Sequence, residues 1–184
     1  MKGDLMNTPP RISPEFSRVL SADSIGSLAQ RREIVAEVSE RAALARRFGL
    51  ISLERLTATL ELRRHMNDVV GLTGHLVGDV VQSCVVSLAP VAAHIETDFE
   101  ASYSARENPL SQVDFDPLDR DGPEPLIDGQ VDLGEAVAQQ LAVALDPYPR
   151  AAGAVLQPVQ PAASGEQSGK NRPFDALVTL KKRP

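Results

Sequence analysis

Cysteine and aromatic side chains are scarce in this chain of 184 residues. Cys84 is the only cysteine, tryptophan is absent, and phenylalanine and tyrosine together make up 4% of the sequence. A single cysteine excludes an internal disulfide and any zinc site built from several cysteines. Because 42% of the residues are hydrophobic, a core is still expected, and it must consist mainly of Leu, Val, Ile and Ala.

Long hydrophobic runs are also missing. The longest apolar stretch, residues 80–95, is interrupted by Gln82, Ser83, Ser87 and Pro90. It falls short of the roughly 20 apolar residues that a membrane-spanning helix needs. Residues 1–16 contain no hydrophobic segment after their lysine, so no secretory signal is expected there. These features predict a cytoplasmic protein with no membrane partner.

Negative charge is concentrated in one part of the sequence. The formal net charge is −6, but residues 94–150 hold three arginines and thirteen Asp or Glu, a net charge of −10. Residues 1–72 carry +2 and residues 151–184 carry +3. An acidic surface repels the phosphate backbone of nucleic acids and attracts basic proteins. The distribution argues against DNA binding and restricts RNA contacts to basic residues outside the acidic segment.

The order of the periodic segments predicts an α+β fold. Alternating or continuous apolar residues indicate strands at 15–22, 32–39, 55–64, 69–84 and 92–105. A short helix is expected from Ser39 to a C-capping Gly49, and a second at 133–145 after an N-capping Asp132, with Glu135 as its capping-box partner. We therefore expect a mainly antiparallel, strongly bent β-sheet packed with two short helices, and flexible ends.

Composition also suggests how the chain is divided. Residues 1–14 are expected to be a disordered N-terminus and residues 15–150 a single α+β domain. Residues 151–170 are rich in Pro, Gly, Ser and Gln, which is typical of a linker. Residues 171–184 form a C-terminal amphipathic segment with a basic tail. In the N-terminal strands, the expected core side chains are Phe16, Val19, Ile34, Ala36 and Val38.

Cys84 and the histidines are the residues most suited to chemistry. The neighbours of Cys84 in the sequence supply neither a base nor a positive charge, which favours a buried core thiol on a strand over a nucleophile. His75 and His94 lie in predicted strands and could meet across the sheet. With an acid they would begin a metal site, or with a loop aspartate a His/Asp hydrolase. No ligand spacing, phosphate-binding loop or nucleophile elbow supports either, so we expect no enzyme and no cofactor.

The charged residues supply the candidate binding sites. The strand at 92–105 alternates apolar with acidic side chains, and an acid-rich loop follows it without the regular spacing of a calcium loop. The candidate partner-binding residues are Glu96, Asp98, Glu100, Asp114, Asp116, Asp119 and Asp121. The candidate RNA contacts are the basic residues Arg31, Arg32, Arg46, Arg47, Lys181, Lys182 and Arg183.

Four segments, in order, resemble a bacterial family, the large ribosomal RNA subunit accumulation proteins (YceD-like). They are "QSC" at 82–84, "ETDFEASY" at 96–103, "PLIDGQVDLGEAVAQQLAVALDPYP" at 125–149 and "NRPFDALVTLKK" at 171–182. Residues 39–64 look like the form found in alphaproteobacterial members. The resemblance implies a cytoplasmic, non-enzymatic factor in the processing or accumulation of large-subunit ribosomal RNA. Its implied partners are a large-subunit ribosomal protein, a pre-ribosomal particle or precursor ribosomal RNA, and an acidic adaptor or holding chaperone for a basic ribosomal protein is the alternative.

The sequence also departs from that family. Many members have a C-x-x-C pair where this chain has Val81 and Cys84, and a further cysteine after the late helix, where residues 146–154 have none. Cys84 resembles the remaining half of a lost pair. A zinc-dependent role is therefore not carried over, and apolar packing alone is expected to hold the two elements together.

Overall fold

The computed structural model describes residues 14–65, 68–105 and 123–156. The chain divides after Ala154, and the fold described here is that of the unit before this point. All of the predicted N-terminus at 1–14 except Pro14, most of the linker at 151–170 and the whole segment at 171–184 lie outside the described residues. Within the described ranges, no helix is long and apolar enough to cross a membrane.

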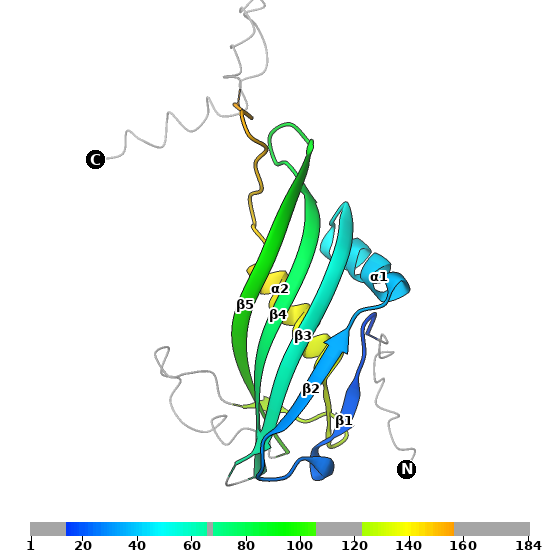
Figure 1. The fold of residues 1–184 in the computed structure, drawn as a ribbon, viewed down its shortest axis with the longest axis vertical. Helices are drawn as coiled ribbons and strands as arrows, with labels where there is room; N and C mark the ends of the chain where they lie inside the picture. Colours follow the sequence, from blue (N-terminus) through cyan, green and yellow to red (C-terminus); the bar gives the residue numbers. More distant parts are fainter. Residues whose placement is uncertain (1–13, 66–67, 106–122, 157–184) are drawn as a thin grey trace, which may run out of the picture. The chain divides into compact units, whose positions relative to one another are not determined.

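Five strands form the main sheet, in the spatial order β2-β3-β4-β5-β6 (Figure 1). All neighbouring pairs are antiparallel except β5–β6, which is parallel. The strands are β2 (Gln30–Val35), β3 (Ser52–Arg64), β4 (Val69–Ser83), β5 (Pro90–Ser104) and β6 (Glu124–Pro125). The prediction of a mainly antiparallel, bent sheet in an α+β fold is confirmed.

The remaining elements are short. A second sheet pairs β1 (Val19–Ser21) with β7 (Gln130–Asp132), and a 3-10 turn, η1 (Ala22–Ser24), follows β1. The two predicted helices are present as α1 (Val38–Phe48) and α2 (Leu133–Ala144). In Figure 1, α2 crosses behind the main sheet and α1 lies beside β3.

One face of the main sheet is buried, and the reason is the alternation of its long strands. In β3 every second residue from Leu56 to Leu62 is apolar and at most 3% exposed, whereas the residues between them are polar. β4 repeats the pattern, and its glycine at position 74 leaves room for the Phe99 ring. A Cβ atom at Gly74 would lie 2.4 Å from that ring. The strand alternation predicted at 55–64 and 92–105 is thus confirmed.

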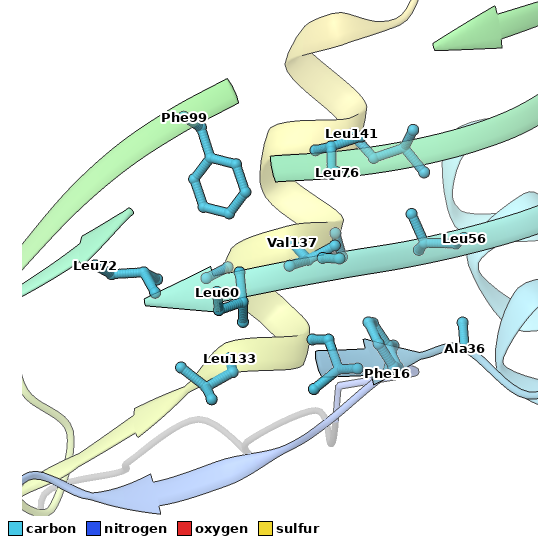
Figure 2. Close-up of a cluster of buried hydrophobic side chains, with 14 of the residues drawn as sticks. Phe16, Ala36, Leu56, Leu60, Leu72, Leu76, Phe99, Leu133, Val137 and Leu141 are labelled. Atoms are coloured by element: carbon cyan, nitrogen blue, oxygen red, sulfur yellow. The ribbon is translucent and has the colours of Figure 1, made fainter. Parts of the chain in front are cut away.

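The core is completed by α2. Leu133, Val137 and Leu141 recur at helical spacing, are at most 3% exposed, and face the sheet residues Leu60 and Leu76 (Figure 2). These fully buried aliphatic side chains stabilise the domain by roughly 1.5–3 kcal/mol each relative to exposure. In the described residues, most side chains on the opposite face of β3, β4 and β5 are partly or fully exposed.

Both helices are capped by residues next to their ends, but each helix differs from the prediction at one residue. α1 ends at Gly49 as predicted, in the left-handed conformation with φ 66°, which favours glycine. Its N-cap is Glu37 rather than Ser39, because Glu37 and Glu40 form a reciprocal capping box. Asp132 caps α2 as predicted by accepting from two backbone N–H groups, but the carboxylate of Glu135 binds Arg47 instead of the helix end.

The N-terminal strands were predicted less well. Phe16, Ile34 and Ala36 are buried as expected, but Val19 is 54% exposed and Val38 is 73% exposed. Val38 belongs to the first turn of α1, not to a strand, because β2 already ends at Val35. β1 is only three residues long, and its partner β7, like β6, was not expected within the long loop. Such pairing between distant segments leaves no periodic local signal.

Candidate functional site

The solvent face of β4 and β5 carries the acidic residues of the described chain that were predicted to bind a partner. We call Glu96, Asp98 and Glu100 of β5 the acidic row. All three are exposed, and their neighbours on β4 are Val77, His75 and Thr73, respectively. Their predicted exposure is confirmed, while Asp114, Asp116, Asp119 and Asp121 lie outside the described residues.

Two histidines flank the acidic row and are held by carboxylates. His75 Nδ1 lies 2.7 Å from Asp98 Oδ1, and His94 Nδ1 lies 2.6 Å from Asp79 Oδ1. The two Nε2 atoms lie 3.3 and 3.7 Å from the two oxygens of Glu96. The hydrogen bond with Asp79 raises the pKa of His94, since the carboxylate favours the imidazolium. The carboxylate of Glu96 therefore lies between the two imidazoles and is close to both.

Within the described residues, these two histidines are paired with carboxylates and not with a nucleophile. Both ring nitrogens of each imidazole are directed at carboxylates, so neither faces a nucleophile. A cavity of about 360 Å³ over the centre of the sheet includes His75 and Asp98. A larger one of about 680 Å³ includes His65 and no residue of the two His–Asp pairs. Among the described residues, the two imidazoles thus belong to an exposed network of carboxylates.

Cys84 is buried, as predicted, but its surroundings are not those of a strand in an apolar core. It lies directly after β4, in the turn to β5, and its Sγ accepts hydrogen bonds from the backbone N–H groups of Ala151, Val86 and Ser87 at 3.3–3.4 Å. These donors, Ala151 foremost, lower the pKa of the Cys84 thiol to about 6. The positive setting that the flanking side chains lack is supplied by the backbone.

We expect the Cys84 thiol of the folded protein to titrate near pH 6. Thiolate absorbance measured against pH, with Cys84→Ser as the blank, would show this midpoint. In denaturant the midpoint should return to about 8.5. Because the folded pKa is the lower one, the contribution to stability is fully present above the unfolded pKa and is lost as pH falls through about 6. A folded-state midpoint at or above pH 8 would contradict this assignment.

Hydrogen bonds, and not apolar packing alone, connect the Cys84 turn to the segment after α2. The Val85 N–H donates to the carbonyl of Pro149 at 2.9 Å, and the amide of Gln82 donates to the carbonyl of Asp146 at 2.9 Å. The expectation of purely apolar contact was wrong, because the end of β4 presents polar groups that need partners.

The residues around Cys84 do not fit the cysteine metal site that is implied by the family which the sequence resembles. Cys84 is the only sulfur ligand, since methionine aside the chain has no other sulfur. Across residues 14–65, 68–105 and 123–156, no group of three or more His, Cys, Asp or Glu side chains is arranged to hold a metal ion.

The candidate RNA contacts are dispersed. Arg31 and Arg32 are exposed on β2 and Arg46 is exposed on α1. Arg47 is engaged within the fold: its guanidinium contacts both oxygens of Glu135 at 2.7 and 2.8 Å and Glu15 at 3.0 Å. This ion-pair network, which links α1 to α2, was missed because its members are far apart in the sequence. Lys181, Lys182 and Arg183 lie outside the described residues.

Comparison with known proteins places the larger part of the chain in one family. The family model described as "Large ribosomal RNA subunit accumulation protein YceD" matches residues 72–181. The match covers most of β4 and all of β5, β6, β7 and α2, so it includes both the acidic row and Cys84. No curated protein and no solved structure matches the chain.

Proposed function

Because the chain belongs to the YceD family of large ribosomal RNA subunit accumulation proteins, we propose that it acts in the cytoplasm as a non-enzymatic binding factor for large-subunit assembly. Its direct partner is a basic large-subunit ribosomal protein, alone or in a pre-ribosomal particle. The observation that carries this proposal is the acidic row on the open face of the sheet, inside the part that matches the family.

The charge of this surface suits a basic protein better than RNA. The side chains of Glu96 and Asp98 are 59% and 87% exposed, so both remain available to a partner. Opposite charges across an interface accelerate encounter and exclude like-charged molecules. A phosphate backbone would be repelled by the same carboxylates. If RNA is bound directly, we expect the contact to come from the basic residues on β2 and α1 or from Lys181, Lys182 and Arg183.

We expect neutralisation of the acidic row to weaken partner capture by about tenfold, since each exposed ion pair contributes about 0.2–1 kcal/mol. The variant is Glu96→Gln/Asp98→Asn/Glu100→Gln. Large-subunit ribosomal proteins that copurify with it would be identified and quantified by mass spectrometry, and the level of large-subunit ribosomal RNA would be measured in cells that carry it as the only copy.

The matched control removes the same charge elsewhere on the described surface. Asp23, Glu33 and Glu54 are exposed and lie away from β5, so Asp23→Asn/Glu33→Gln/Glu54→Gln should leave capture unchanged. If both triple variants retain the same ribosomal proteins, the acidic row is not the binding surface. If the purified chain instead binds precursor RNA with an affinity that falls steeply with salt, RNA is the direct partner.

A further inference from the structure

The edge of β5 is unpaired over most of its length. β5 has fifteen residues, and β6 pairs only with Tyr103 and Ser104. Among the described residues, the thirteen at 90–102 therefore have a neighbouring strand on the β4 side alone. Figure 1 shows β5 as the outermost long strand of the sheet. Half of the backbone N–H and C=O groups of this stretch point away from β4, where a further strand could pair with them.

We propose that an extended, lysine- or arginine-rich segment of a partner protein adds to this edge as a further long strand beside β5. This inference rests on the proposed function and specifies how the basic partner is held. Backbone hydrogen bonds to residues 90–102 would supply affinity, and the acidic row would select basic side chains on the incoming strand. No other part of the described sheet combines a free edge of this length with charge of one sign.

The spacing of the acidic row defines the sequence that fits. Glu96, Asp98 and Glu100 are alternate residues, so their side chains stand on one face about 7 Å apart. Alternate residues of an incoming strand have the same spacing. A segment with a cation at every second position therefore places each cation opposite a carboxylate, and the intervening residues should be apolar because the other face of β5 carries Ile95 and Phe99.

Charge decides between this occupant and a second copy of the chain. Antiparallel pairing of two β5 edges would bring the acidic rows of the two copies against each other, and like charges directly opposite are destabilising. The other free edge, β2, is six residues long and includes Arg31 and Arg32, so it does not attract a basic segment. A basic partner at β5 is the arrangement that the charges favour.

The test uses the full chain and a short synthetic peptide in which Lys and Val alternate. Two further peptides are N-methylated, one at every Lys and the other at every Val. In an added strand only one of these sets donates hydrogen bonds to β5. We expect one methylated peptide to lose at least about tenfold in affinity and the other to bind like the parent, with amide exchange slowed at residues 90–102 in the complex.

Several results would overturn strand addition. They are no binding of the parent peptide, equal effects of the two methylated sets, unchanged exchange in β5, or sedimentation of the free chain as a dimer whose β5 amides are protected. The acidic-row triple variant should weaken the parent peptide by about tenfold, whereas the control triple variant should not. If ribosomal proteins depend on the acidic row but the methylated peptides do not differ, strand addition fails while the proposed function stands.

Discussion

Replacement of Phe16 by alanine is expected to lower the free energy of unfolding by about 3–5 kcal/mol. Phe16 precedes the first strand, is 1% exposed and lies among the core side chains shown in Figure 2. The guanidinium of Arg18 also lies 4.8 Å from the centre of its ring. Removal of the ring leaves a cavity that rigid sheet and helix residues fill only in part. Urea denaturation would measure the loss.

Val19→Ala is the matched control for this prediction. Both side chains were expected in the core from the sequence, but Val19 is 54% exposed. Its truncation should change the free energy of unfolding by no more than about 0.5 kcal/mol. Comparable destabilisation by the two variants would mean that burial of the Phe16 ring does not hold the N-terminal segment on the core.

Gly134→Ala is expected to be the second severe substitution, with a loss of about 1–3 kcal/mol. A Cβ atom at this position would lie 2.5 Å from the carbonyl oxygen of Phe16 and 3.0 Å from the Cα of Ser17. These are backbone atoms, so the N-terminal segment would have to move away from α2. The effect is opposite in sign to helix propensity, by which alanine is better than glycine by about 1 kcal/mol.

Gly26 provides the control for the added methyl group. A Cβ atom there would meet no heavy atom within 4 Å, so Gly26→Ala should be close to neutral. The denaturation midpoints of the two variants separate a steric effect from a general effect of glycine replacement. Equal midpoints would show that the backbone around Phe16 moves away from α2 at little cost in free energy.

Both predictions depend on the contact between α2 and the segment around Phe16, and that segment lies outside the residues that the family model matches. Phe16 and Ser17 precede residue 72, where the match begins, yet they contact the first turn of α2 within it. The Arg47–Glu135 ion pair makes a second connection of the same kind. The N-terminal segment and α1 are therefore integral to the fold that presents the acidic row, and destabilising them should impair partner binding indirectly.

The sheet and helices were predictable where local chemistry decides the structure. Alternation of apolar and polar residues is a property of each strand by itself, so β3, β4 and β5 and their buried faces followed from the sequence. The C-capping Gly49 and the N-capping Asp132 satisfy backbone groups within a few residues of their own position. The acidic row belongs to this class, since alternation places it opposite the buried face of β5.

The environment of Cys84 was not predictable in this way. Its burial followed from the apolar run around it, but one of its three amide donors is Ala151, 67 residues later. Likewise, the pairing of β1 with β7 and the contact of Arg47 with Glu135 join segments that are far apart in the chain. The unpaired edge of β5 also emerges only when the strand order is known.

By itself, the sequence determined the long strands β3, β4 and β5, the presence of the two helices, which of their faces are apolar, and that the exposed face of β5 is acidic. Each of these depends on residues within one or two turns or pleats of one another. Only the tertiary structure decided that Phe16 and not Val19 enters the core, that backbone amides surround Cys84, and that β5 keeps a free edge. These depend on the meeting of distant segments, which the packing of the whole domain selects.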